Sequence, residues 1–136
     1  MTKPSVFLSH RRDDDEWAAA FARALERQNV AVWSDKPISP GEKWANLLRK
    51  RLASSDAIVA LVSESEESSP WQLWEIGAAI GMGKRIITIV PAGRQGSGVP
   101  LPLRKVRSLK RGAPAATAAL VAAAIANEID TRRARP

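Results

Sequence analysis

The chain has 136 residues, of which 45% are hydrophobic and 26% are charged, and it contains no cysteine and one histidine. This length and composition predict one globular domain with its own core. The missing cysteines exclude disulfides, thiol catalysis and thiolate metal sites, and a single histidine argues against a metal centre or a Ser-His-Asp triad. No apolar run is long enough to cross a bilayer and the first residues do not resemble a secretory signal, so we expect a cytoplasmic location without membrane contact.

The net charge of +7 is unevenly distributed along the chain. Residues 1–75 contain 10 Lys and Arg against 12 Asp and Glu, whereas residues 76–136 contain 11 against 2. A basic half of this kind can attract nucleic acid or an acidic partner. Because no aromatic residue lies in that half to stack on a base, we favour a solvated basic surface over a nucleic-acid interface.

In the first half of the chain, short apolar runs alternate with amphipathic stretches. Residues 5–9 predict a buried strand, and residues 14–28 predict a helix because their apolar residues recur with helical spacing. Residues 30–33 predict a second strand, which the two prolines of residues 34–40 end. Residues 39–42 form a capping box that predicts the start of a second helix.

The second half continues the same alternation. We expect a strand at 57–62, a helix at 69–83 and a strand at 85–90. A loop at 91–102, an edge strand at 104–109 and a helix at 114–130 follow. Leu120 and Val121 are expected to face inward from the last helix. The alternation predicts an α/β fold, a three-layer sandwich around a parallel sheet. Five strands in a chain of this length predict the flavodoxin-like order 2-1-3-4-5, in which ligands bind outside the carboxyl ends of the strands.

Glu75 is the only charged residue between Ser69 and Gly83. Helical spacing puts Ile76 and Ile80 on one face and Glu75 on the other, and both faces are apolar. The second face must therefore contact another protomer, a ligand or more of the same chain. A carboxylate there loses hydration, which makes Glu75 a candidate functional group.

Four segments, taken in order, resemble motifs of the Toll/interleukin-1 receptor (TIR) domain family. They are Phe-Leu-Ser-His-Arg-Arg at 7–12, Val-Trp-Ser-Asp at 32–35 with Pro-Gly-Glu at 40–42, Ser-Ser-Asp at 54–56, and Ser-Pro-Trp-Gln-Leu-Trp-Glu-Ile at 69–76. The last resembles the Trp-x-x-x-Glu stretch of bacterial NAD-cleaving TIR domains. The resemblance covers nearly the whole chain, which implies a TIR domain over residues 1–130 and a flexible basic tail over residues 131–136.

The resemblance implies an NAD+ nucleosidase that releases nicotinamide and gives ADP-ribose or a cyclic isomer, with a role in bacterial defence, in innate immunity or as an effector. Glu75 would be the catalytic carboxylate, which stabilises the oxocarbenium-like charge on the ribose. Nicotinamide leaves from a ring that is already cationic, so one carboxylate can suffice. NAD+ is then the substrate, and no cofactor or metal is expected.

Other residues would bind the substrate if the resemblance holds. Arg11 or Arg12 could bind the pyrophosphate, or could pair with the acidic residues of their own loop. Trp33 could stack on a ring of the nucleotide or pack at the end of its strand. Trp71 would line the ribose pocket or a protomer contact, and Asp35 would steady the loop after the second strand.

The family also implies self-association into a homo-oligomer or filament through the loop after the second strand. The loop residues expected to make this contact are Lys36, Pro37, Ile38, Pro40 and Gly41. Two other functions remain open. The chain could be a non-enzymatic TIR assembly module, or an enzyme similar to nucleoside deoxyribosyltransferases, which share this fold and use a nucleophilic glutamate.

Overall fold

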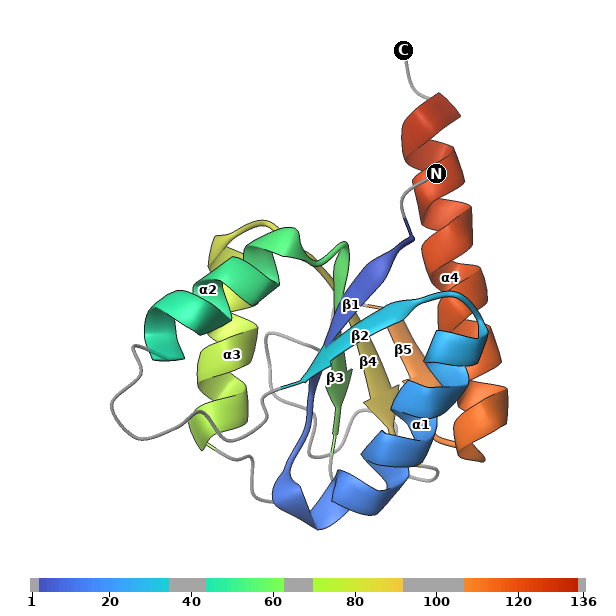
Figure 1. Ribbon diagram of the computed structural model, residues 1–136, viewed down its shortest axis with the longest axis horizontal. Coiled ribbons are helices and arrows are strands. Elements are labelled where there is room, and N and C mark those ends of the chain that lie inside the picture. Colours follow the sequence, from blue (N-terminus) through green and yellow to red (C-terminus); the bar gives the residue numbers. More distant parts are fainter. Residues whose placement is uncertain (1–2, 35–43, 63–69, 92–106, 135–136) are drawn as a thin grey trace.

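The computed structural model describes residues 3–34, 44–62, 70–91 and 107–134. The ribbon of Figure 1 alternates strands with helices along the described chain. In chain order the elements are β1 (Ser5–Ser9), the short 3-10 helix η1 (Arg12–Asp14), α1 (Asp15–Arg27), β2 (Ala31–Ser34), α2 (Trp44–Ser54), β3 (Ala57–Leu61), α3 (Pro70–Gly81), β4 (Arg85–Val90), β5 (Arg107–Lys110) and α4 (Pro114–Ala134).

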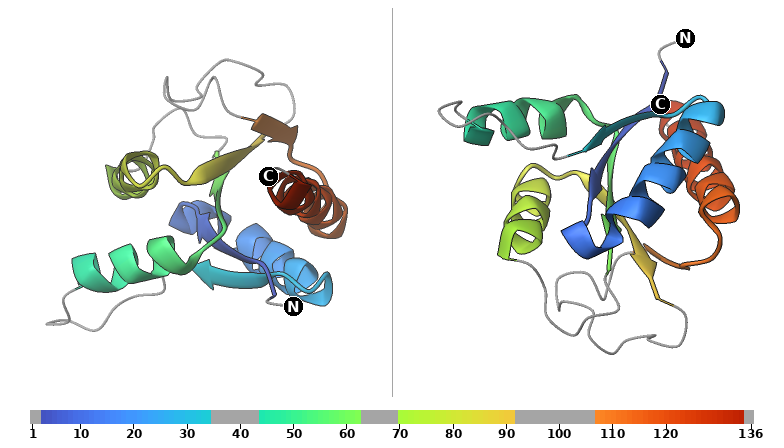
Figure 2. Two further views of the ribbon diagram at one scale, coloured as in Figure 1. Left: turned by 90° about the horizontal axis from the view of Figure 1, so that it is seen from above. Right: turned by 60° about the horizontal axis from the view of Figure 1, so that its bottom comes forward.

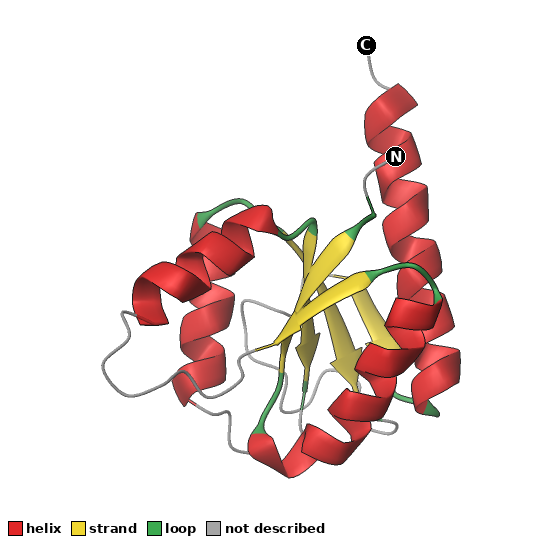
Figure 3. Ribbon diagram, in the orientation of Figure 1, coloured by secondary structure: helices red, strands yellow, loops and turns green. Residues whose placement is uncertain are grey.

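The five strands form one parallel sheet in the order β2-β1-β3-β4-β5, which confirms the predicted α/β fold and strand order. Figure 2 shows α1 and α4 on one side of the sheet and α2 and α3 on the other. Figure 3 shows the same arrangement with the strands in yellow between the helices. The chain is therefore a three-layer sandwich, as a parallel sheet requires when both of its faces are apolar.

Alternation along the strands divides the core into two clusters. From β1, Val6 and Leu8 pack with residues of α1 and α4, whereas Phe7 packs with residues of α2 and α3. All five residues of β3 are buried, as expected for a strand covered by helices on both faces. Ser9 follows Leu8 and so lies on the face of Phe7, which α2 and α3 cover.

The ends of several elements differ from the predicted ones. Asp14, at the N-cap of α1, makes no capping hydrogen bond with its side chain and instead accepts one from Arg111. Asn29 follows α1 with a φ of 63°, a left-handed conformation that asparagine tolerates. The edge strand was expected over residues 104–109; β5 occupies Arg107–Lys110, and residues 104–106 lie outside the described part of the chain.

The last helix is longer than expected, and one residue that was expected to face the core is exposed. α4 continues to Ala134, past the expected end at residue 130, and its many alanines favour a long helix. It extends beyond the sheet toward the C-terminus of the chain (Figure 1). Val121 is buried as predicted, but the inward position of Leu120 is wrong because 54% of that residue is exposed.

Two basic residues of the second half have structural partners. The Lys84 ammonium donates to the carbonyl oxygens of Ala53 and Ser55 at 2.8 and 2.9 Å, where a cation stabilises the C-terminal end of α2. The guanidinium of Arg111 donates to the Asp14 carboxylate at 3.0 Å and joins the loop before α4 to the start of α1. Part of the basic excess therefore stabilises the fold.

None of the helices in the described part of the chain combines the length and apolarity needed to cross a membrane.

Candidate active site

Glu75 and Ser9 meet inside the protein at the carboxyl end of β1. Ser9 is the last residue of β1, and its hydroxyl donates a hydrogen bond of 2.9 Å to Oε1 of Glu75 in the second turn of α3. Neither residue has measurable exposure to solvent. The structure thus places the predicted catalytic carboxylate at the end of the sheet where ligands bind in this fold.

The sequence directs both side chains to this point by simple periodicity. Ser9 lies on the sheet face that α3 covers, because it is two residues after Phe7. Glu75 lies beside Ile76 and one turn before Ala79, and all three are buried on the side of α3 that meets the sheet. The expected helix faces are therefore wrong in part, because Glu75 faces inward and Ile80 is 46% exposed.

Burying the Glu75 carboxylate costs the fold free energy, and a residue that costs stability is a candidate for a functional role. Transfer of a charged group out of water is unfavourable, and the Ser9 hydroxyl offsets only part of that cost. Such a group can stabilise a positive charge strongly, because little water competes for it. The described residues contain no group of three acidic, histidine or cysteine side chains arranged to hold a metal ion.

Small side chains lie in one row across the sheet beside Glu75. Ala60 pairs with Ser9, Thr88 pairs with Ala60 and Ser108 pairs with Thr88. The hydroxyl oxygens of Thr88 and Ser108 are 2.7 Å apart. Apolar residues such as Ile58, Val62 and Ile86 occupy other positions of this face, so the row is its more polar part. The sequence prediction missed this row, since each hydroxyl stands alone in its own strand.

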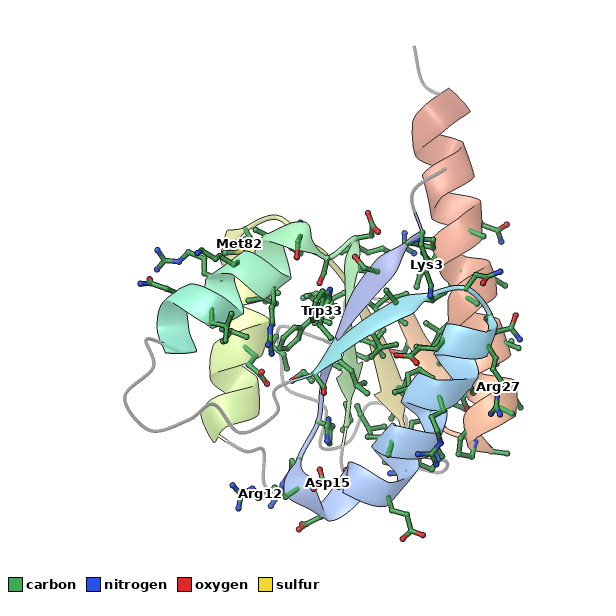
Figure 4. All side chains as sticks on the ribbon, viewed as in Figure 1. Lys3, Arg12, Asp15, Arg27, Trp33 and Met82 are labelled. Atoms are coloured by element: carbon green, nitrogen blue, oxygen red, sulfur yellow. The ribbon has the colours of Figure 1, made fainter. Side chains whose placement is uncertain are left out.

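Trp33 lies near the end of β2 on the same face of the sheet. It pairs with Phe7 in the register of the two strands, and Figure 4 shows it on the side that α2 and α3 cover. The residue is 43% exposed, so its ring is not packed into the core. The guanidinium carbon of Arg51 lies over the ring at 5.5 Å from its centroid. The sequence prediction named Trp33 but missed Arg51, whose position depends on the packing of α2.

The two arginines after β1 have different surroundings. Arg11 lies 3.6 Å from the carboxylate of Asp13, so the pairing within its own loop does form. Arg12 is exposed in η1 (Figure 4). The Nε2 atom of His10 lies 2.8 Å from Oδ1 of Asp15. Both arginines lie at the carboxyl end of β1, where a phosphate could reach them.

The side chains of the remaining predicted site residues lie outside the described part of the structure. Asp35 and the assembly residues Lys36, Pro37, Ile38, Pro40 and Gly41 are not among the described residues. Trp71 belongs to the first turn of α3, and the structure describes its backbone only. Their predicted roles stay predictions.

Comparison with known proteins identifies the family. A model of the TIR domain matches residues 6–121. The CMP N-glycosidase BcmB of Clostridium botulinum has a similar structure, with a TM-score of 0.66, 18% identity and coverage of 86% of this chain and 96% of that chain. The TIR domain of the Toll-related receptor TRR-2 from Hydra magnipapillata has a TM-score of 0.62 and 20% identity, covering 77% of this chain and 82% of that one.

The TIR domains of the activated Roq1 resistosome, which recognises the effector XopQ, are also similar, with a TM-score of 0.59, 20% identity and coverage of 94% and 76% of the two chains. No curated protein matches the sequence significantly. At these identities the solved structures show a shared fold. The family model extends over most of the residues that form the sheet and its helices, and on this evidence the chain belongs to the TIR domain family.

Proposed function

We propose that the chain is an NAD+ nucleosidase that breaks the bond between nicotinamide and ribose, with Glu75 as its catalytic carboxylate. The observation that carries the proposal is the buried Ser9–Glu75 hydrogen bond at the carboxyl end of β1. BcmB, which has a similar fold, is a CMP N-glycosidase, and CMP contains the same kind of bond between a base and a ribose.

The reaction needs stabilisation of positive charge more than it needs an acid. As the bond from C1′ to the pyridinium nitrogen breaks, its electron pair stays with the ring and nicotinamide leaves as a neutral molecule. Positive charge then develops on C1′ and the ring oxygen of the ribose, and the Glu75 carboxylate stabilises it. Attack by water on C1′ gives ADP-ribose and releases one proton, whereas attack by an adenine nitrogen gives a cyclic isomer.

Trp33 is well placed to hold the base while Glu75 acts on the sugar. Trp33 of β2 pairs with Phe7 of the neighbouring strand β1, and Phe7 lies two residues before Ser9. With about 3.3 Å per residue along a strand and about 4.8 Å between strands, the Cα atoms of Trp33 and Ser9 are about 8 Å apart. This separation is within the span of one nucleoside, so a base stacked on the exposed indole would hold its ribose near the end of β1 that carries Ser9.

Substrate choice separates this proposal from its alternatives. Concentrated protein is incubated with NAD+, with CMP, or with a deoxynucleoside and a second base, and the free bases are quantified by chromatography. Nicotinamide release supports the proposal, cytosine release indicates a nucleotide N-glycosidase, and base exchange indicates a deoxyribosyltransferase. No reaction in any mixture favours the non-enzymatic assembly module.

The hydroxyl of Ser9 is expected to hold Glu75 in its working position. Ser9→Ala removes the described donor to Oε1, so we expect kcat for nicotinamide release to fall about 10-fold, the size expected for one hydrogen bond to a charged group. Ser5→Ala, at the other end of β1, is the matched control and keeps the wild-type kcat. Equal rates for Ser9→Ala and wild type would show that this hydrogen bond does not serve the reaction.

The indole of Trp33 is expected to contribute to substrate binding rather than to bond cleavage. Trp33→Ala removes the stacking surface, and we expect KM to rise about 10-fold with a smaller change in kcat, since stacking of one base on an aromatic ring has an effect of this size. Trp33→Phe keeps an aromatic ring and retains most of the affinity. An unchanged KM in Trp33→Ala would exclude Trp33 from the base site.

We also propose that activity depends on self-association, and one observation favours this. Ile80, in the last turn of α3, and Met82, just after it, are 46% and 37% exposed, which leaves apolar surface at the end of the helix that carries Glu75. The TIR domains of Roq1 belong to a resistosome assembly. Specific activity is expected to rise with protein concentration in the range where light scattering detects association, and a constant specific activity across that range contradicts this proposal.

A further inference from the structure

Arg51 holds the end of β2 from the neighbouring helix. Its guanidinium lies over Trp33 at 5.5 Å, and its Nη1 donates a hydrogen bond of 3.3 Å to the carbonyl oxygen of Ser34. Arg51 belongs to the last turns of α2 and is half-buried. Two contacts from one side chain thus fix both the indole ring and the last residue of β2 relative to α2.

Part of Trp33 stays exposed although Arg51 lies over its ring. The guanidinium covers one face of the indole, while 43% of the residue remains exposed. We take the uncovered part of the indole as the surface on which a planar base stacks, so that the indole separates the base from the guanidinium. Trp33 is on the same sheet face as Ser9, and a base held there leaves its ribose toward Glu75.

The two ends of the site then carry opposite charges. The Arg51 cation lies behind the base, and the Glu75 carboxylate lies on the side of the sugar. In NAD+ the positive charge starts on the pyridinium ring and moves to C1′ as the bond breaks, and a neutral base would instead become negative. In both cases the departing base becomes more negative and the ribose becomes more positive. A cation at the base end and an anion at the sugar end favour this shift in the transition state more than in the bound substrate.

We propose that Arg51 is a positioning residue for base departure: it fixes the Trp33 ring and supplies positive charge behind the leaving base. This inference rests on the proposed function. It implies that Arg51 contributes to kcat and to the choice of leaving group, with little contribution to substrate affinity. A role in folding alone would predict no dependence on the leaving group.

The test uses NAD+ and analogues whose pyridine bases have different pKa values, with release of the base as the readout. Arg51→Gln is expected to lower kcat about 10-fold with KM unchanged or lower, because a cation near the bound pyridinium is lost. The fall should be largest for the bases of highest pKa, which leave least readily. Arg51→Lys keeps the charge and is expected to recover most of the rate.

The matched control is Arg49→Gln, which makes the same charge change at an exposed position of the same helix and is expected to leave kcat unchanged. An equal dependence on leaving-group pKa in Arg51→Gln and wild type overturns the Arg51 inference alone. A fall in activity that comes only from a higher KM also overturns it. If the wild-type protein releases no base from any of these compounds, the proposed function fails, and the Arg51 inference fails with it.

Discussion

Glu75→Gln is expected to abolish base release without lowering the thermal midpoint of the protein. The loss should be at least about 100-fold, the usual effect of removing one group that stabilises transition-state charge. The fold should not suffer, because glutamine has the same shape, its carbonyl oxygen can accept the Ser9 hydrogen bond, and it has no charge to bury. Loss of activity with equal or higher stability is typical of a functional buried charge.

The control for this substitution is Glu26→Gln, at an exposed position of α1. Activity is measured as nicotinamide release and stability as the midpoint of thermal unfolding followed by circular dichroism. The control should change neither quantity. Glu75→Gln with wild-type activity would remove Glu75 from the mechanism, and Glu75→Gln that unfolds at a much lower temperature would show a structural role for the carboxylate.

Arg111→Met is expected to lower the free energy of unfolding by about 3 kcal/mol, because it leaves the buried Asp14 carboxylate without its cation. The loss includes the stacking of the guanidinium on Trp17, whose ring centroid is 4.8 Å away. The measurement is the urea midpoint of unfolding with the slope held in common. Trp17 also donates to the carbonyl oxygen of Gly112 at 3.1 Å, so the whole contact between α1 and the loop before α4 should weaken.

Two further variants make this prediction specific. Lys110→Met changes the same charge at the exposed neighbouring position and should shift the free energy of unfolding by less than about 0.5 kcal/mol. The double variant Asp14→Asn with Arg111→Met should be more stable than Arg111→Met alone, because it has no buried charge without a partner. If the two are equally stable, the Asp14–Arg111 pair contributes nothing beyond packing.

The fold could be predicted because the sequence marks its strands clearly. The apolar run at 57–62 and the mostly apolar segment at 85–90 match β3 and β4 closely, and each strand is followed by a helix or a loop rich in glycine and proline. That alternation leaves few topologies open once crossovers are right-handed. The structure confirms the resulting strand order, and Glu75 lies at the carboxyl ends of the strands.

The parts that could not be predicted depend on contacts between distant segments. Helical periodicity alone cannot tell which apolar face of α3 meets the sheet, so Ile80 was expected to be buried and is exposed. The contact between Asp14 and Arg111 joins residues 97 positions apart, so the local sequence around α1 could not reveal it. The contact of Arg51 with Trp33 likewise joins α2 to β2 and leaves no signal in either segment alone.

The central claim is that the buried carboxylate at the end of β1 allows a base to leave its ribose. Its most direct test is a time course of nicotinamide release from NAD+, followed by chromatography, for concentrated wild-type protein and Glu75→Gln in parallel. We predict steady release by the wild type, with an equal amount of ADP-ribose or its cyclic isomer, and background release by the variant. Equal release by both proteins, or none by the wild type at any protein concentration, would contradict the claim.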